Sequence, residues 1–588
     1  MAPREGLEPS TNGLTARRST ELSYRGSTAQ LLTKIYSYAY WLCSEREFFA
    51  TRLGNNQGLL KYFNRSALHH KFCKVRNPLS DDLDVAPPGA QVRLRYTSFI
   101  NYALTMASAI FGVFFLIILT RRLSIEDYGI WVLIWRYEGY FLIPTVIFST
   151  WVTRDISRGK NTSITGVTAS IFFGMASIPF YLLLVIFLLG NLQQLLVPLL
   201  FSSFCLFLDF LSSGLNSVSY GHAPQIVGYA GFAYDSGQLI FGLIFILSIG
   251  FGLTLAVIAA LMGRVMMDTV SIIMNRSILH KSSLQLHQII TWIKSSWLPL
   301  FGSIAGLLVA FDVLVVSLVY KSQIPIAYYG VCISIASLAS FAGVVSGSLY
   351  PKILSKRNIE DLKEAIWLTS LLSLPIVFLI IIYAKPLCAL LNPNYIPVAP
   401  SLRIIVFGIY FLLMSNIAST VYYGLDPFDA KKLESKTFLK SSLFRGYWLT
   451  FVLNGIYLIL LYALSSLSIA YLSFVTIWVS VLASLYITSF AAFIILIRRR
   501  FGMAFPIYSI LRDILIFTIP AIAAAIPSIL LPVRISQSFY LTLSSLIPIA
   551  LLSLAVYLGV LYVIERRFRT TLRDVIKKIY PAIRRSEA

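Results

Sequence analysis

The chain contains about fourteen apolar segments, each long enough for an α-helix to cross a bilayer. Runs of this length exclude the buried strands of a soluble protein, and they lack the alternating pattern of a transmembrane barrel. We therefore predict an all-α polytopic membrane protein. The segments cover approximately residues 98–120, 130–152, 165–190, 193–213, 226–250, 252–275, 298–320, 325–349, 365–384, 402–423, 446–465, 469–497, 512–532 and 539–563.

The composition agrees with a membrane location. Of the 588 residues, 57% are hydrophobic and only 13% are charged, whereas soluble domains carry about 25% charged residues. The net charge of +23 would suggest a nucleic-acid partner in a soluble protein. Here the basic residues lie in short loops between apolar segments, so we expect contacts with anionic membrane lipids and no nucleic acid.

The basic residues also predict the topology. They concentrate in alternate loops, and placing the N-terminus inside puts almost all of them on the inner side. Both termini are then cytoplasmic, in a multi-pass protein of the cell membrane. The predicted inner residues are Arg154, Arg158, Lys160, Arg276, Lys281, Lys294, Lys352, Lys356, Arg357, Lys363, Lys431, Lys432, Lys436, Lys440, Arg445, Arg498, Arg499 and Arg500, followed by the basic tail.

A sequence repeat indicates two related halves. Ile125–Ile130 reads IEDYGI, and Ile326–Val331 reads IAYYGV. Each copy lies between two apolar segments, so we expect equivalent outside turns and an axis along the membrane normal. The predicted organisation is a first six-helix half (98–275), a cytoplasmic linker (276–297), a second half (298–497), two additional helices (498–565) and a basic cytoplasmic tail (566–588).

Residues 1–97 differ from the rest of the chain. They are polar, basic and poorly patterned, so we predict a cytoplasmic tail that is largely disordered, or an upstream extension that is not translated. The five cysteines show no C-x-x-C spacing, and no nucleotide-binding loop is present in the sequence. We therefore expect neither a metal site nor a cofactor, and no catalytic residues.

Ionisable residues inside apolar segments are candidates for function, because a charge in hydrocarbon costs about 3 kcal/mol or more. Arg136 and Arg264 are candidate substrate-binding residues, since a guanidinium stays charged when buried and binds phosphate oxygens in pairs. Arg264 and Asp268 are four residues apart on one helix face, so they either neutralise each other or leave Arg264 facing a cavity.

Three acidic residues are candidates for coupling to H⁺ or Na⁺. Asp312 lies among Val, Leu, Ala and Phe residues, where an unpaired carboxyl group takes up a proton or a cation. The alternative for Asp312 is a hydrogen bond to a neighbouring helix. Asp268 and Glu138 complete the set. Asp209 and Asp235 lie toward the predicted inner face and are weaker candidates.

The stretch Asn101–Lys160 resembles the polysaccharide-biosynthesis membrane proteins, which are O-antigen and teichoic-acid type flippases of the multidrug/oligosaccharidyl-lipid/polysaccharide exporter superfamily. The resemblance is carried by Thr120–Ile130 (TRRLSIEDYGI) and by the basic turn Arg154–Lys160. In the second half it is carried by Asp312, Tyr329-Gly330 and Leu349-Tyr350-Pro351, and more loosely by Asn392–Tyr395. It covers roughly residues 98–497 and carries over no site residues.

The resemblance implies a flippase, not an enzyme, that moves a polyprenyl-(pyro)phosphate-linked glycan to the outer leaflet by alternating access of the halves. Its partners would be that glycan, membrane lipids and glycan-assembly enzymes. One alternative is an ion-coupled antiporter for drugs or small cations of the same superfamily. Others are a membrane-embedded glycan polymerase or transferase, which the lack of a large outside loop disfavours, and a scaffold subunit.

Overall fold

The structure is a computed structural model that describes residues 88–157, 159–189, 196–248, 252–320, 322–343, 359–425, 441–467 and 470–573. Contacts divide the chain into two units, Met1–Arg93 and Leu94–Ala588, and nearly all of the described residues belong to the second unit. All regular secondary structure in the described ranges is helical. Twelve helices are long and apolar enough to cross a membrane, and a bent pair brings the number to thirteen. The predicted all-α membrane protein is thereby confirmed.

Seven of the described helices belong to the first predicted half. The first of them begins ten residues before the predicted start of the membrane region; the predicted tail before Pro88 lies outside the described residues. The helices are α5 (Pro88–Arg122), α6 (Ile125–Phe141), α7 (Thr145–Ser157), α8 (Ser163–Leu189), α9 (Leu196–His222), α10 (Gln225–Ser248) and α11 (Leu253–His280). Helix α10 occupies the predicted span 226–250 but is not one of the twelve candidate membrane helices.

The second predicted span is broken into two helices. Helices α6 and α7 meet at an angle of 62°. Pro144 directly precedes α7, and its ring removes an N–H donor and clashes with the carbonyl one turn earlier. A proline in this position breaks a membrane helix while the rest of the span keeps its hydrophobic length. The break separates the two ends of the span, which contact different parts of the molecule.

The remaining helices follow the predicted spans, with two short helices that the sequence did not predict: α12 within the linker and α18 after the ninth span. The elements are α12 (Leu286–Ser295), α13 (Trp297–Leu307), η2 (Leu308–Phe311), α14 (Asp312–Tyr320), α15 (Ile324–Ala336), η3 (Ser337–Gly343), α17 (Ile359–Ile382), α18 (Ala384–Leu391), η4 (Pro393–Val398), α19 (Ala399–Gly424), α21 (Ser442–Ser465), α22 (Tyr471–Phe501), α23 (Ile507–Leu530) and α24 (Phe539–Ile564).

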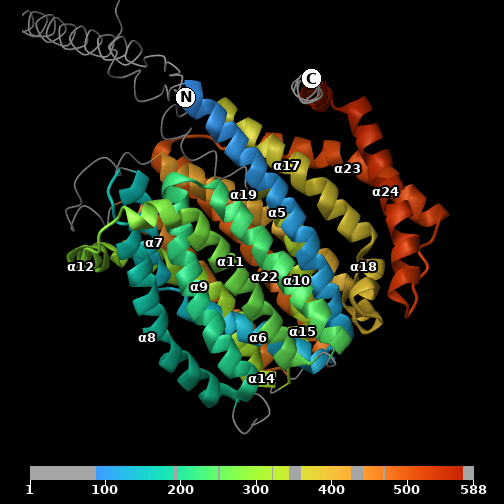
Figure 1. Cartoon of the computed structure of the whole chain (residues 1–588). Helices are drawn as coiled ribbons and strands as arrows, with labels where there is room; N and C mark the ends of the chain where they lie inside the picture. The colour runs from blue at the N-terminus through green and yellow to red at the C-terminus, as the bar shows by residue number, and fades with distance from the viewer. Residues whose placement is uncertain are drawn as a thin grey trace, which may run out of the picture. The chain divides into compact units, whose positions relative to one another are not determined.

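Helix packing follows a similar order in the two halves. In the first, α9 packs on α8 and α11, and α10 packs on α11; in the second, α19 packs on α17 and α22, and α21 packs on α22. The additional helices α23 and α24 pack on each other and on α17, at the edge of the bundle (Figure 1). The axis along the membrane normal that would relate the halves stays a prediction.

The repeated Tyr-Gly pairs lie in helices, and the prediction of outside turns was wrong in this detail. Ser124 caps α6 by accepting a hydrogen bond from the Asp127 amide at 3.0 Å, so the helix has begun before Tyr128 is reached. The second copy lies in α15, which has a proline in its first turn. The turns precede the repeat in both halves.

The two glycines of the repeat bring α6 and α15 into close contact. A Cβ atom added to Gly129 would overlap the carbonyl oxygen of Gln323, and one added to Gly330 would lie 2.5 Å from Val132 Cγ2. Small residues allow membrane helices to approach backbone to backbone. Helices α6 and α15 belong to different predicted halves, so the repeat forms a contact between them.

Candidate functional site

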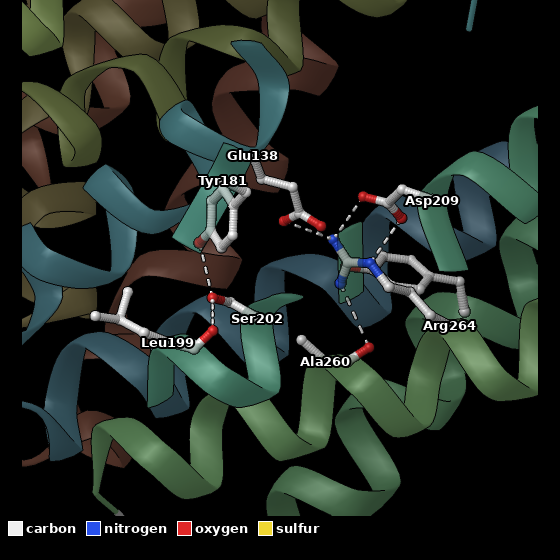
Figure 2. A network of polar contacts seen from close by, with 8 residues as sticks. Glu138, Tyr181, Leu199, Ser202, Asp209, Ala260 and Arg264 are labelled. Atoms are coloured by element: carbon white, nitrogen blue, oxygen red, sulfur yellow. Dashed lines mark hydrogen bonds and ion pairs between the residues drawn. The ribbon is translucent and has the colours of Figure 1, made fainter. Parts of the chain in front are cut away.

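The most strongly charged buried cluster joins three helices of the first half. Arg264 of α11 binds Asp209 of α9 through two hydrogen bonds, Nε to Oδ1 at 2.7 Å and Nη2 to Oδ2 at 3.1 Å. Glu138 of α6 approaches the same Nη2 atom that donates to Asp209, with Glu138 Oε2 at 3.6 Å (Figure 2). The Arg264 side chain is 8% exposed and that of Glu138 is 2% exposed. A paired, fork-shaped contact of this kind is the geometry that arginine favours.

Aromatic rings enclose the same guanidinium. The Cζ atom of Arg264 lies 4.4 Å from the ring centre of Trp135 and 5.5 Å from that of Tyr234. Nη1 also contacts the carbonyl oxygen of Ala260 at 3.4 Å. Cation–π contacts of this type strengthen when the cation is removed from water. The guanidinium of Arg264 is therefore held in place by two carboxyl groups, a main-chain carbonyl and two aromatic rings.

Asp268 is not the ion-pair partner of Arg264, although the two share a helix face. Its Oδ1 accepts a hydrogen bond from Ser212 at 2.6 Å. Its Oδ2 is buried and has no hydrogen-bond partner within the described ranges. The partner of Arg264 is instead Asp209, which the sequence ranked as a weaker candidate. Spacing along one helix reveals only partners on that helix, so this pairing between helices left no signal in the sequence.

The cluster contains more acids than bases. Arg264 supplies one positive charge, while Asp209 and Glu138 supply two carboxyl groups, and Glu138 Oε1 is buried without a hydrogen-bond partner among the described residues. An uncompensated charge is costly in a membrane interior. The arrangement can therefore accommodate one proton or one small cation beside the ion pair. Glu138 is the candidate for it, because its Oε1 has no hydrogen-bond partner among the described residues.

Asp312 forms a second buried cluster, in the second half. Its Oδ2 accepts hydrogen bonds from Tyr329 (2.8 Å), Tyr457 (3.0 Å) and Trp478 (3.2 Å), and its Oδ1 accepts one from the Val313 amide (2.7 Å). The rings of Tyr329 and Trp478 are stacked at 3.9 Å. Four donors satisfy the carboxylate as an anion. The alternative prediction for Asp312, hydrogen bonds to neighbouring helices, describes this geometry, and its coupling role stays a prediction.

Arg136 faces the second cluster, not the first. Its Cζ atom lies 6.0 Å from the ring centre of Tyr329, and among the described residues Arg136 forms no ion pair within 4.0 Å. The two predicted substrate-binding arginines thus belong to different clusters. Arg264 lies in the first cluster with Glu138, and Asp268 is hydrogen-bonded to Ser212 nearby. Arg136 lies near Asp312 in the second cluster.

A polar pocket of about 660 Å³ lies beside the first cluster. Asp209 belongs to both, since its side chain is 25% exposed while Arg264 behind it is 8% exposed. The pocket follows α7 and α9 toward their C-terminal ends, which the topology prediction places on the cytoplasmic side. Its lining residues are Leu142, Ser149, Thr150, Thr153, Asp209, Ser212, Ser213, Asn216, Ser217, Tyr220 and Met267.

On the side of the molecule that the topology prediction places outside, a polar contact joins the two predicted halves. It is here called the outer contact. Arg121, at the end of α5, donates to the carbonyl oxygens of Leu390 (2.9 Å), Ala389 (3.2 Å) and Gln537 (3.0 Å). The same segments are joined by hydrogen bonds from Thr120 to Leu391 at 3.2 Å and from Asn392 to Thr120 at 3.1 Å. All these residues lie in or beside predicted outside loops.

The linker helix α12 is held to the other end of α7. Asp155 accepts hydrogen bonds from Trp292 (3.2 Å) and Gln288 (3.3 Å) of α12, and it forms an ion pair with Lys160 at 2.8 Å. Trp151 donates to Ser296, directly before α13, at 2.8 Å. These contacts tie α7 to the segment that connects the two predicted halves.

Solved structures of membrane transporters are similar to this chain in fold. Neither a protein-family model nor a curated protein matches the chain. Among solved structures, the lipid II flippase MurJ in an inward closed conformation is 14% identical, with 79% of this chain and 99% of MurJ covered and a TM-score of 0.54.

Two multidrug transporters are also similar to the chain. An inward-facing member of the MATE family, of the MOP superfamily, is 15% identical over 68% of this chain and 94% of its own (TM-score 0.48). The Vibrio cholerae MATE transporter VcmN is 12% identical over 69% and 98% (TM-score 0.46). The similarity to the lipid II flippase shows that the chain has the MurJ fold.

Proposed function

We propose that this chain is a transporter that moves a lipid-linked oligosaccharide or polysaccharide precursor across the cell membrane. The observation that carries the proposal is the polar pocket of about 660 Å³ beside the Arg264 cluster, in a bundle with the MurJ fold. A glycan cannot cross hydrocarbon unaided, so a carrier must offer it a polar surface at membrane depth. Both termini would lie in the cytoplasm, as the distribution of basic residues among the loops predicts.

Alternating access requires the outer contact to break. In the described conformation Arg121 ties α5 to α18 and to the segment before α24, and the Gly129–Gln323 approach brings α6 against α15. Opening toward the outside would release these contacts while the pocket side closes. Rocking of two halves around a site near the membrane midplane is the general mechanism for folds with repeated halves.

The Arg264 cluster supplies a means of coupling transport to H⁺ or Na⁺. Its extra carboxyl group would take up the ion in one conformation and release it in the other, and Glu138 and Asp268 are the residues proposed for this role. Asp312 is the corresponding candidate in the second half. Arg264 would bind a phosphate only after it released Asp209, whereas Arg136 has no ion-pair partner to lose among the described residues.

An ion-coupled antiporter for drugs or small cations is the second candidate. The excess of carboxyl groups over guanidinium groups in the cluster favours it, because it would attract a cation. The pocket lining favours the glycan, because all of its lining residues except Leu142 and Met267 carry a hydroxyl, amide or carboxyl group. The two candidates differ in which molecule accumulates when the protein is missing.

A deletion strain separates the candidates. We expect it to accumulate lipid-linked glycan in the inner leaflet, and expression of the wild-type chain to reverse this. Arg264→Ala should fail to reverse it although the variant reaches the membrane. Normal lipid-linked glycan together with altered sensitivity to cationic drugs would contradict the flippase and support the antiporter.

A further inference from the structure

The polar pocket is built mainly from one face of α9. Its residues Asp209, Ser213, Asn216 and Tyr220 recur at intervals of three and four, so their side chains point in one direction. Helix α7 supplies the opposing hydroxyl groups. From Asp209 to Tyr220 the lining extends over about three turns of α9. The pocket is therefore a continuous polar strip and not a single polar residue in an apolar wall.

Many of the polar groups in this strip have no bond to the protein. Thr153 and Ser217 donate to main-chain carbonyl oxygens. By contrast, no hydrogen bond within the described ranges engages the side chains of Ser149, Thr150, Ser213 and Tyr220, and Asn216 Oδ1 is buried without a partner. Helical serines and threonines commonly bond the carbonyl one turn earlier. The hydroxyl groups of Ser149, Thr150, Ser213 and Tyr220 therefore remain available to a ligand.

The charge of the pocket disfavours an anion. No lysine or arginine is among the described residues that line it, and both oxygens of Asp209 already face Arg264 from behind. Asp268 adds a second carboxyl group just behind Ser212. A phosphate is bound most strongly by cationic donors, and the described lining residues include no cation. A lipophilic cation needs an apolar or aromatic surface, and here Leu142, Met267, the Tyr220 ring and the methyl groups of Thr150 and Thr153 supply one between the polar groups.

We propose that this pocket is a subsite for uncharged sugar units, and that the phosphate of the same molecule binds outside it. The inference rests on the proposed function and specifies its substrate class. Sugar hydroxyl groups both donate and accept, so they match a lining of carboxylate, amide and hydroxyl groups. Thr150, Asp209 and Asn216 are the residues assigned to them, with the Tyr220 ring at the mouth. The volume is in the range of about 300–1,000 Å³ found for small-molecule sites.

Arg264 acquires a different role in this arrangement. It is a positioning residue that fixes the Asp209 carboxylate through both of its oxygens and leaves the exposed edge of that carboxylate to the sugar. The paired geometry resists rotation of the carboxylate. Replacement of Arg264 by lysine would keep the charge and lose the orientation, so sugar binding should weaken while the fold survives.

Protection of an introduced cysteine tests the subsite. In the full-length chain, Cys43 and Cys73 are replaced by serine, the buried Cys205, Cys332 and Cys388 are kept, and Ser213→Cys places a thiol in the pocket. The purified protein is treated with a hydrophilic maleimide in the presence of maltotriose, tri-N-acetylchitotriose, inorganic pyrophosphate or tetraphenylphosphonium. A Ser466→Cys variant, with its thiol exposed far along the chain, is the matched control for effects on the reagent.

At least one neutral oligosaccharide should slow labelling of Ser213→Cys and leave Ser466→Cys unaffected. A Kd of about 1 mM predicts slowing by about tenfold at about 10 mM oligosaccharide. Asn216→Leu, which keeps the side-chain size and removes the amide, should abolish this protection while the protein elutes as before in size-exclusion chromatography. Protection by pyrophosphate or tetraphenylphosphonium alone, or by none of the four, would overturn the inference.

This test and the deletion strain can fail independently. If a sugar protects the purified protein but the deletion strain has normal lipid-linked glycan, the subsite is supported and the proposed transport is contradicted. If the deletion strain accumulates lipid-linked glycan but no sugar protects the purified protein, the proposed transport is supported and the subsite is contradicted.

Discussion

Gly129 of α6 lies so close to the carbonyl oxygen of Gln323 that any side chain at position 129 would overlap it. At Gly330 the close neighbour is a side chain, with 2.5 Å between the added Cβ and Val132 Cγ2. The glycines occupy equivalent places in the repeated sequence, one in each predicted half. The repeat therefore marks the crossing of α6 and α15, on the same side of the molecule as the outer contact.

Gly129→Ala should weaken this crossing and favour opening at the outer contact. The overlap involves backbone atoms, so it can be relieved only by movement of one helix. The native Cys388 and Cys332 are buried in this region. We expect both to react faster with a membrane-impermeant maleimide in Gly129→Ala than in the wild type. Gly139→Ala is the control, because its Cβ would meet no atom within 4 Å. Unchanged reactivity in Gly129→Ala would show that the crossing does not hold the outer side closed.

Arg121→Gln should weaken the outer contact directly. It removes charge-assisted hydrogen bonds to three carbonyl oxygens, which contribute roughly 1–3 kcal/mol together at this partly exposed site. We expect a lower midpoint of thermal unfolding and faster labelling of Cys388. Arg122→Gln changes the same charge at an exposed neighbour and should leave both values near those of the wild type. Equal effects of the two substitutions would indicate charge alone as the cause.

The sequence predicted the fold well because the signal for each membrane span is local. An apolar run of sufficient length requires a helix wherever it is located, and every predicted span is matched by one to three helical elements. The Arg264–Asp209 pair could not be predicted, because it depends on how α9 and α11 lie against each other. The hydroxyl groups of α9 were missed for a related reason: serines in an apolar helix also occur where they merely bond the preceding turn.

Asp312→Asn should destabilise the second cluster without a change of shape. The asparagine amide would face hydroxyl and indole donors that need an acceptor, at a cost of about 2–4 kcal/mol. Tyr457→Phe removes one of these donors and should cost about 1 kcal/mol. Thermal unfolding in detergent measures both. If Asp312→Asn unfolds like the wild type yet loses ion-dependent transport, the carboxyl group serves coupling and not the packing of α14 with α21 and α22.

Glu138→Gln should separate coupling from stability in the first cluster. The substitution removes the extra carboxyl charge and leaves the Arg264–Asp209 pair intact, so the variant should fold normally. We expect transport to persist but to lose its dependence on an H⁺ or Na⁺ gradient. Arg264→Ala is the opposite case, because two carboxyl groups would then remain buried without a cation. An unaltered gradient dependence in Glu138→Gln would remove Glu138 from the coupling mechanism.

Transport itself can be measured in liposomes that contain the purified chain and a polyprenyl-pyrophosphate-linked oligosaccharide with a fluorescent group on its sugar. A membrane-impermeant reductant bleaches only molecules in the outer leaflet. We expect the wild-type protein to make nearly all of the fluorescence accessible to the reductant, whereas Asn216→Leu and protein-free liposomes should leave the inner-leaflet fraction protected. Protection of that fraction in the presence of folded wild-type protein, with and without an ion gradient, would contradict the proposal that this chain moves lipid-linked glycans.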